Sequence, residues 1–387
     1  MINGFRNANC VFASGVKKSS ISFKEGRISS FDDELEYPKL KDGVYLAPGF
    51  IDEHIHGANG SDVMDASFSS LDNMAKSLLR EGVTSFLATT MTESTSSIEK
   101  ALSNVNEYRK AERHQVARVE GVHLEGPFIS PEYKGAQPLE FIRVPNADEL
   151  DRFYSLSGES IKLVTFAYEN DKDGAFLSYC LNKGIKASLG HSSCGGKLAI
   201  EGYKKGIGCV THLFNAQKSF HHRDVGITGS ALLTDGVKVE LIADLHHSCP
   251  EAVEMVFRLK KKEDIVLISD STEAKYLEEG AKAKLGSQDI YVKNGVAVLS
   301  NGVIAGSILR LDEALRNVRM LAKGYSYSDL INLVTLNPAK NIGLDKEIGS
   351  LELGHRADYV LLDKDFHVLA TFVDGRCSYG SIDSLID

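Results

Sequence analysis

Eight short apolar runs alternate with segments of helical periodicity between residues 49 and 272 of this 387-residue chain. The runs span residues 49–57, 82–90, 117–126, 161–169, 184–192, 206–216, 237–247 and 264–272. A repeated strand–helix–strand pattern implies parallel strands joined by right-handed crossovers. Eight such units, over roughly 250 residues, are what a closed (β/α)8 barrel requires. We therefore predict an α/β fold of the TIM-barrel type, with an open doubly wound sheet as the alternative.

Two of the intervening segments indicate where their helices end. Residues 69–82 place apolar side chains at helical spacing and stop at Gly82, and residues 195–206 stop at Gly206. Glycine commonly ends a helix because it adopts the left-handed conformation without steric cost. A helix is predicted over each segment.

The two ends of the chain differ from the middle. Residues 1–47 and 345–387 contain short β-rich runs interrupted by glycines and Asp-Gly turns. We expect them to form one small β-sandwich, flanking a barrel of residues 48–344. A further hairpin over 290–299, turning at Asn294-Gly295, is expected beside the mouth of the barrel.

Charge and composition exclude several classes of protein. The net charge is −9, and the longest Lys/Arg block is 260–262, which argues against nucleic-acid binding. The first fifteen residues hold no apolar stretch of signal-peptide length, and no apolar run reaches 18 residues, so we expect a cytoplasmic protein with no membrane partner. The six cysteines show no C-x-x-C spacing and are expected to be reduced.

The stretch PGFIDEHIHG places two histidines near the end of the first run. Residues two apart on a strand point the same way, so His54 and His56 share a face while Ile55 takes the other. An H-x-H pair alone is weak evidence for a site. Further polar residues end the third, fifth, sixth and eighth runs: Glu125, His191, His212 and Asp270.

All of these positions fall at the carboxyl ends of predicted strands, the face on which barrel enzymes carry their active sites. Four imidazoles and two carboxylates are a typical ligand set for one or two divalent cations such as Zn²⁺ or Fe²⁺. A bound metal would lower the pKa of water and polarise a carbonyl group. A nearby carboxylate could then take the proton of that water, and Asp270 is the natural candidate.

Several motifs together resemble the amidohydrolase superfamily, and within it the family of N-acetylglucosamine-6-phosphate deacetylases. They are PGFIDEHIHG, HLEGPF, GHS, THLFNA, the Asp of SDST, AGS followed by LDEALRN, and TLNPAKNIGL, in consistent order from about residue 46 onward. HLEGPF with THLFNA is the most specific combination. The resemblance implies hydrolysis of the N-acetyl amide of N-acetylglucosamine 6-phosphate to glucosamine 6-phosphate and acetate, in amino-sugar catabolism.

The resemblance also implies roles for individual residues. The family binds its catalytic metal through the positions of Glu125, His191 and His212, and uses the position of Asp270 as general base and then acid. Because this chain keeps both His54 and His56, it is similar to members that hold two metals, with Glu125 as the bridge. Zn²⁺, Fe²⁺, Co²⁺ and Mn²⁺ all suit such ligands.

The substrate contacts follow from the same resemblance. Backbone groups and amide side chains would hold the sugar at Ala136, Gln137, Asn215, Ala216, Ile304, Ala305 and Gly306. Arg223 and His247 would meet the phosphate, for which a guanidinium and an imidazole are suited.

Three positions depart from the family pattern. Gln137 stands where single-metal members often have a histidine that polarises the scissile carbonyl, a task that a second metal at His54 and His56 could take over. Gln217 replaces a methionine, and Leu245 replaces a glycine. The last change leaves a His246-His247 pair; His247 is assigned to the site by its offset, and His246 stays open as the alternative.

Three other functions are alternatives to this one. N-acetylgalactosamine 6-phosphate differs from the expected substrate at one hydroxyl and is the nearest alternative. A dihydroorotase-type enzyme would commonly carry a metal-bridging lysine at the fourth strand, where this chain has only Lys162, at the start of the run. A non-catalytic sugar-phosphate sensor is the remote alternative.

Similar enzymes are usually dimers or tetramers, so a homo-oligomer is expected. In some of them a residue of the neighbouring subunit contributes to the phosphate site.

Overall fold

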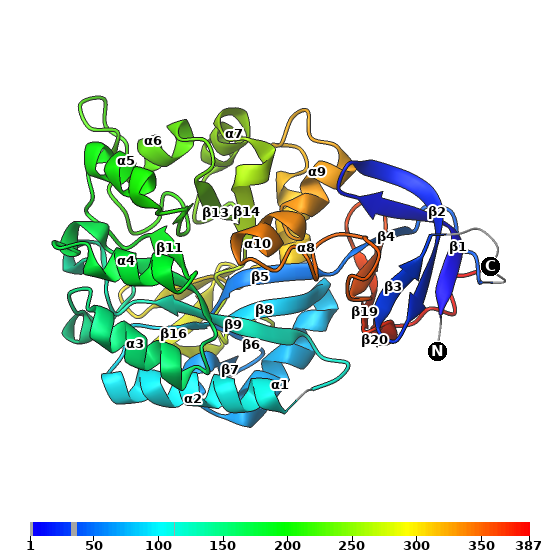
Figure 1. Cartoon of the computed structure of the whole chain (residues 1–387), viewed down its shortest axis with the longest axis horizontal. Coiled ribbons are helices and arrows are strands. Elements are labelled where there is room, and N and C mark those ends of the chain that lie inside the picture. Colours follow the sequence, from blue (N-terminus) through cyan, green and yellow to red (C-terminus); the bar gives the residue numbers. More distant parts are fainter. Residues whose placement is uncertain (1–2, 32–36, 112) are drawn as a thin grey trace.

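The computed structural model describes residues 3–31, 37–111 and 113–387. Figure 1 shows a larger α/β part and a smaller β-rich part, in which strands from the blue N-terminal and red C-terminal ends of the chain lie together. The larger part carries the eight predicted strands, and the smaller part carries both termini.

The eight apolar runs form one eight-stranded parallel sheet. Its members, in chain order, are β5 (Phe50–Ile55), β8 (Val83–Thr90), β9 (Arg118–Glu125), β10 (Ile161–Phe166), β11 (Lys186–Leu189), β12 (Cys209–Val210), β13 (Lys238–Ile242) and β14 (Ile265–Ile268). The first and last strands meet, since the Asp270 amide donates to the His54 carbonyl and the His56 amide donates to the Ser271 carbonyl, both at 2.9 Å. The predicted (β/α)8 barrel is confirmed, and the open doubly wound sheet was the wrong alternative.

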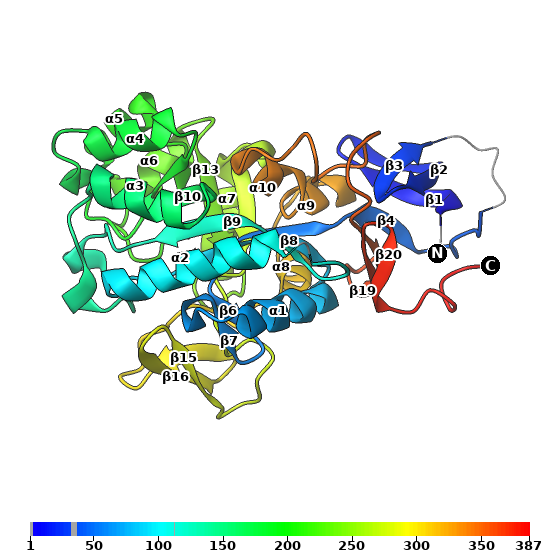
Figure 2. The same cartoon turned by 60° about the horizontal axis from the view of Figure 1, so that its bottom comes forward.

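Helices connect the strands and cover the barrel, as Figures 1 and 2 show. They are α1 (Phe68–Ser77), α2 (Thr95–Lys110), α3 (Ala147–Leu156), α4 (Ala175–Asn182), α5 (Gly196–Lys205), α6 (Gly226–Leu233), α7 (Pro250–Leu259), α8 (Leu311–Val318), α9 (Tyr327–Asn332) and α10 (Leu336–Asn341). Both predicted helix ends are confirmed, because Gly82 and Gly206 take φ values of 85° and 117°. Within the described ranges, none of the helices is both long and apolar enough to cross a bilayer.

Short 3₁₀ helices complete the connections. They are η1 (Val63–Asp65), η2 (Leu78–Glu81), η3 (Pro131–Tyr133), η4 (Leu139–Phe141), η5 (Tyr168–Asn170) and η6 (Lys262–Asp264). A two-stranded ribbon, β6 (Gly57–Ala58) and β7 (Ser61–Asp62), follows the H-x-H motif directly.

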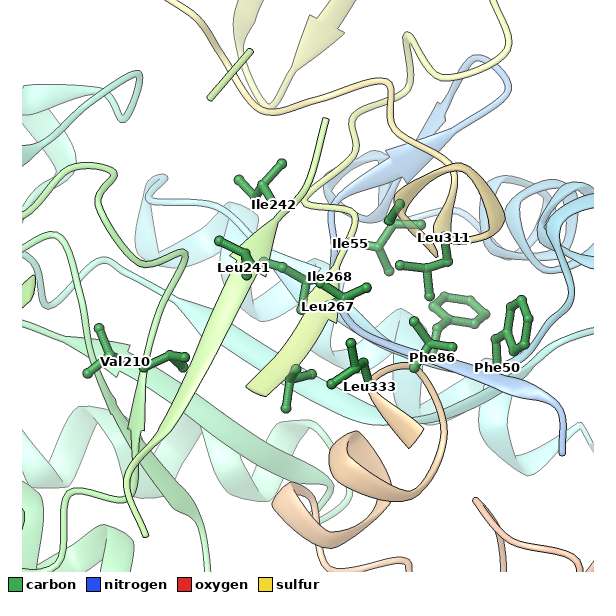
Figure 3. Close-up of a cluster of buried hydrophobic side chains, with 14 of the residues drawn as sticks. Phe50, Ile55, Phe86, Val210, Leu241, Ile242, Leu267, Ile268, Leu311 and Leu333 are labelled. Atoms are coloured by element: carbon green, nitrogen blue, oxygen red, sulfur yellow. The ribbon is translucent and has the colours of Figure 1, made fainter. Parts of the chain in front are cut away.

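The main core lies between the barrel strands and their covering helices. Figure 3 shows Phe50, Phe86 and Leu311 among the clustered side chains of this layer, and all three are fully buried. Burying such a side chain contributes about 1.5–3 kcal/mol each. This packed layer therefore holds the strands in place, and with them the backbone positions of the polar residues at their carboxyl ends.

The two ends of the chain build a seven-stranded sheet. Its order is β20 (Arg376–Gly380), β19 (Val368–Val373), β18 (Tyr359–Leu362), β4 (Tyr45–Pro48), β1 (Gly4–Phe12), β2 (Gly15–Lys24) and β3 (Arg27–Ser30). Antiparallel pairing of β18 with β4 joins the two ends, and Phe5, Tyr359 and Phe372 pack in the core of this part. The predicted β-domain built from both termini is present.

The boundaries at 47/48 and 344/345 stay a prediction, and residues 1–2 and 32–36 of the first part lie outside the described residues.

A three-stranded antiparallel sheet stands beside the barrel mouth. It consists of β15 (Lys282–Leu285), β16 (Gln288–Lys293) and β17 (Val296–Leu299), and Figure 2 shows β15 and β16 projecting from one side of the barrel. The predicted turn at Asn294 and Gly295 is confirmed, with φ values of 54° and 76° that suit a two-residue hairpin loop. The Gln288 side chain donates to the Ala136 carbonyl, which ties this sheet to the loop after β9.

A buried ion pair anchors the loop that carries Asp270. Lys275 Nζ lies 2.6 Å from Glu81 Oε1, and both side chains are fully buried. Glu81 also accepts from the Tyr276 hydroxyl at 2.8 Å and from the Leu311 amide at 2.6 Å. One carboxylate thus joins η2, the loop after β14 and the start of α8.

Replacing Lys275 with methionine is expected to destabilise the protein by about 3–5 kcal/mol, because Glu81 would be left buried without its cation. Urea denaturation measures this. Lys282→Met is the matched control: Lys282 pairs with Asp289 at 2.7 Å, but that pair is exposed, so the denaturation midpoint should barely move. Equal midpoints for the two variants would contradict a stabilising role for the buried pair.

Candidate metal centre and active site

Glu125, at the end of β9, lies among four histidines at the barrel mouth. Its Oε1 is 3.1 Å from His212 Nε2, 3.3 Å from His191 Nε2 and 3.5 Å from His54 Nε2. Its Oε2 is 3.1 Å from His56 Nε2. Side chains from β5, from the residue after it and from the turns after β11 and β12 therefore converge on the Glu125 carboxylate, and each of its oxygens faces at least one imidazole.

Asp270 completes the cluster from the turn after β14. Its Oδ1 lies 3.3 Å from His56 Nε2 and 3.4 Å from His54 Nε2. Two sets of potential ligand atoms meet in this cluster, each within 4.8 Å of one another: His54, His56 and Asp270 in the first, and Glu125, His191 and His212 in the second. Two further groups with the same spacing consist of fully buried residues: His54, His123 and Glu240, and Glu53, Cys209 and Glu240.

The donor set fits divalent cations. His54 Nε2 is fully buried between carboxylates and has no hydrogen-bond partner among the described residues, although a buried polar atom normally finds one. A cation shared with Glu125 and Asp270 would satisfy it. Imidazole and carboxylate suit Zn²⁺, Fe²⁺, Co²⁺ and Mn²⁺ alike, and two sets leave room for one or two ions.

The electrostatics of the cluster favour positive charge between the carboxylates. Burial opposes the charged form of His54, but Asp270, Glu240 and Glu125 raise its pKa well above the usual value. Burial likewise opposes the charged form of His56, but hydrogen bonds to Asp270 and Glu125 raise its pKa to about 9. Burial alone would raise the pKa of Glu125, whereas the surrounding imidazoles, His54 first, hold it well below its usual value. A divalent cation meets the same electrostatic demand.

Three of these residues have a strained backbone. His191, His212 and Asp270 take φ values of 48°, 28° and 47°, in the left-handed region that side chains with a Cβ rarely adopt. Such conformations cost roughly 1–3 kcal/mol each and cluster at functional sites. The strain at these strand ends is consistent with side chains aimed into a common centre.

Outer contacts fix the orientation of several potential ligands. His54 Nδ1 lies 2.9 Å from Glu240 Oε2, and His191 Nδ1 lies 2.9 Å from the Tyr133 carbonyl. Contacts of this kind set the tautomer of an imidazole and aim its other nitrogen at a metal.

Gln137 fixes the orientation of the Glu125 side chain. Its Nε2 donates to Glu125 Oε2 at 2.9 Å, and its Oε1 accepts from the Thr92 amide at 2.8 Å. Both ends of the amide are therefore engaged.

A cavity of about 170 Å³ opens directly above the cluster. His56, Glu125, His191, His212 and Asp270 line its floor, while His54 lies deeper and is fully buried. Most residues expected to contact substrate also line the cavity, namely Ala136, Gln137, Asn215, Ala216, His247, Ile304 and Gly306. Met91, Gly135 and Leu285 complete the lining.

The remaining expected contacts lie elsewhere. Ala305 is buried behind the lining, in the core of the three-stranded sheet. Arg223 is exposed outside the lining, and its Nη1 lies 3.0 Å from His222 Nε2. Of the histidine pair, His247 lines the cavity and is held by Asp244 at 2.7 Å, whereas His246 faces a neighbouring surface groove.

The positions that depart from the family pattern have distinct surroundings. Leu245 has a φ of 63°, a conformation that glycine adopts without strain. Gln217 is buried and its Nε2 lies 3.4 Å from Thr228 Oγ1, outside the cavity lining. Lys162 stands at the start of β10, away from the mouth.

Three buried residues beneath the cluster were not predicted from the sequence as part of the site. Glu240 contacts His54 as above, His123 Nε2 lies 2.7 Å from Thr165 Oγ1, and Glu53 accepts from Asn341 Nδ2 at 2.7 Å. Each is an ionisable residue inside an apolar strand run. Because a buried ionisable group needs a polar partner, an ionisable residue inside an apolar strand run is the sequence pattern that could have indicated these contacts.

An eight-stranded barrel with imidazoles and carboxylates gathered at the carboxyl ends of its strands defines a barrel hydrolase with a candidate metal centre. The model of the Amidohydrolase family matches residues 45–377. The chain belongs to the amidohydrolase family.

Its relatives narrow the comparison. The chain is 39% identical to the N-acetylglucosamine-6-phosphate deacetylase of Bacillus subtilis (strain 168), over 94% of this chain and 93% of that protein. It is 35% identical to the N-acetylgalactosamine-6-phosphate deacetylase of Escherichia coli O157:H7, over 87% and 88%. The crystal structure of N-acetylglucosamine-6-phosphate deacetylase from Thermotoga maritima superposes with a TM-score of 0.88 at 36% identity, covering 97% of this chain and 99% of that chain.

Proposed function

We propose that this chain is a metal-dependent deacetylase that hydrolyses N-acetylglucosamine 6-phosphate to glucosamine 6-phosphate and acetate. The observation that carries the proposal is the convergence of Glu125 with four histidines and Asp270 on the floor of one cavity. The similarity to deacetylases over nearly the whole chain supports the choice of substrate.

His54, His56, Glu125, His191, His212 and Asp270 would hold one or two divalent cations, of which Zn²⁺, Fe²⁺, Co²⁺ and Mn²⁺ are candidates. A bound cation supplies Lewis acidity and lowers the pKa of water.

Asp270 would be the general base and then the general acid. Although its burial opposes ionisation, His54 and His56 lower its pKa below the usual value, so it stands ready as a carboxylate. It takes a proton from the water that attacks the N-acetyl carbonyl carbon. It then donates that proton to the nitrogen as the C–N bond breaks, which leaves acetate and the free amine.

The surroundings of Gln137 support a two-metal centre. Its Oε1 accepts from the Thr92 amide and one of its two Nε2 hydrogens donates to Glu125, so the side chain is held in an orientation that serves Glu125. A cation held by His54 and His56 would polarise the substrate carbonyl in its place.

Asn215, Ala216, Ala136 and the 304–306 segment are proposed to hold the sugar, and His247 is proposed to bind the phosphate. Arg223 is proposed as the second phosphate ligand. Its exposed position on the 218–224 loop suits a contribution to the cavity of a neighbouring subunit, so we propose a homo-oligomer, a dimer or a tetramer.

We further propose a cytoplasmic location. The six cysteines are all free thiols, which is usual where glutathione and thioredoxin keep thiols reduced.

The N-acetylgalactosamine epimer is the second candidate substrate, favoured by the relative from Escherichia coli O157:H7 and by the changed residues Gln217 and Leu245.

A parallel acetate-release assay with both sugar phosphates, before and after removal of metal by a chelator, tests the proposal. Faster turnover of the glucosamine epimer, lost on chelation and restored by added Zn²⁺ or Fe²⁺, is expected. Faster turnover of the other epimer would reassign the substrate. Metal binding with no deacetylation of either would point to a sugar-phosphate sensor.

A further inference from the structure

The interior of the barrel directly below the candidate metal centre contains two carboxylates outside the two ligand sets of that centre, although each belongs to a buried group of potential ligand atoms, with Cys209 in the group that they share. Glu240, on β13, and Glu53, on β5, are both fully buried, and they lie within 4.8 Å of each other through one atom of each. Glu240 contacts potential ligands of both sets, whereas Glu53 is bonded to Asn341 on α10.

We propose that Glu240 is a positioning residue that holds His54 and His212 in place for metal binding. Glu240 Oε2 lies 2.9 Å from His54 Nδ1 and accepts from the His212 backbone amide at 3.2 Å. This inference rests on the proposed metal centre, and it concerns how the protein prepares that centre.

The first contact determines the tautomer of His54. With Glu240 as a carboxylate, which can only accept, Nδ1 of His54 carries the proton of this contact. Nε2 then keeps its lone pair when the ring is neutral, and this atom lies 3.5 Å from Glu125 Oε1 and 3.4 Å from Asp270 Oδ1. The nitrogen that faces the candidate metal position is therefore the one available for coordination.

A comparison with the other imidazoles shows what is particular to His54. The outer nitrogen of His191 meets a backbone carbonyl, and Nδ1 of His56 and of His212 has no hydrogen-bond partner among the described residues. In the part of the chain that the structure describes, the outer contact of His54 alone among the four is a carboxylate. A carboxylate partner raises the basicity of an imidazole ligand more than a neutral carbonyl does.

The second contact links the two ligand sets. His54 belongs to the set with His56 and Asp270, and His212 belongs to the set with Glu125 and His191. Because β13 is separated from β5 by β14 in the sheet, the Glu240 side chain reaches between strands that are not neighbours. A shift of this carboxylate would therefore disturb both sets.

Glu53 supplies a matched control. It is the same residue type, equally buried, close to Glu240, and its bonded oxygen accepts from Asn341 Nδ2 at 2.7 Å with no contact to a candidate ligand side chain in its hydrogen bonds. Glu53→Gln and Glu240→Gln thus remove one buried carboxylate each from the same region, but only the second alters the partner of His54.

The test measures metal binding directly, without substrate. Co²⁺ affinity is determined by chelator competition, and metal content by elemental analysis, on the full-length wild type, Glu240→Gln, Glu240→Asp and Glu53→Gln. Glu240→Gln should loosen at least one bound ion by about 10- to 100-fold. Glu53→Gln should bind as the wild type does, and Glu240→Asp, which keeps the charge on a shorter side chain, should be intermediate.

Equal loosening by both Gln variants would overturn the proposal, since any buried charge would then matter equally. Wild-type affinity in Glu240→Gln would overturn it as well. If Glu240→Gln does not fold, Glu240→Asp decides, because a shortened carboxylate with wild-type affinity excludes a positioning role. The metal affinity and the deacetylase activity are measured separately. If Glu240→Gln binds metal more weakly but the wild type deacetylates no amino-sugar phosphate, the positioning role of Glu240 stands and only the proposed substrate is rejected.

Discussion

Replacement of Asp270 with asparagine is expected to lower kcat by roughly 10²- to 10⁴-fold, the usual contribution of a positioned general acid–base group. Asparagine keeps the shape of the side chain but cannot accept and return a proton. The Asp270 side chain lies at the cavity floor, 3.3 Å from His56 Nε2, where no other carboxylate among the lining residues except the proposed bridging Glu125 could substitute for it. Steady-state kinetics of acetate release measure the effect.

Asp171→Asn is a suitable control for this variant. Asp171 also follows a barrel strand, β10, but its carboxylate accepts from the Phe176 and Leu177 amides and caps α4. Its kcat should stay close to that of the wild type. Elemental analysis should show that Asp270→Asn retains metal at Glu125, His191 and His212. A kcat for Asp270→Asn within a few-fold of the control would remove Asp270 from the proposed mechanism.

Much of the fold could be predicted because it depends on local pattern. The strand runs, the helix ends at Gly82 and Gly206 and the turn at Asn294-Gly295 each follow from residues close together in sequence. The convergence of the site follows from one further rule, that the carboxyl ends of parallel barrel strands share a rim. His54 and Asp270 could therefore be placed together although more than two hundred residues separate them.

Contacts that cross the interior could not be predicted in this way. Whether Glu240 meets His54 depends on strand tilt and side-chain rotamers across the barrel, which no local pattern encodes. The role of Gln137 was equally hidden, because its partners Thr92 and Glu125 come from different strands. The family resemblance also paired Arg223 with His247, but the structure places only His247 in the cavity lining, since Arg223 lies on an exposed segment ahead of α6.

The second large effect is expected when His54 and His56 are removed together, as His54→Gln/His56→Asn. For the proposed two-metal centre, the metal content should fall from two ions per chain to one, because Glu125, His191 and His212 form a separate ligand set. Turnover should fall by roughly 10²- to 10³-fold, since Lewis-acid stabilisation of a carbonyl oxygen amounts to several kcal/mol and each 1.36 kcal/mol is a factor of ten. Elemental analysis and kcat are the two measurements.

This outcome follows from the way Gln137 is used. The Gln137 side chain is oriented by Thr92 and Glu125, with one N–H committed to Glu125. In the proposed mechanism the substrate carbonyl would therefore be polarised by the cation at His54 and His56, which the double variant removes. A control that removes the exposed His114 and His367 in the same way should leave turnover and metal content unchanged, because neither residue lines the cavity. Wild-type turnover in the His54/His56 variant would mean that one ion suffices and that carbonyl polarisation comes from a residue of the second set.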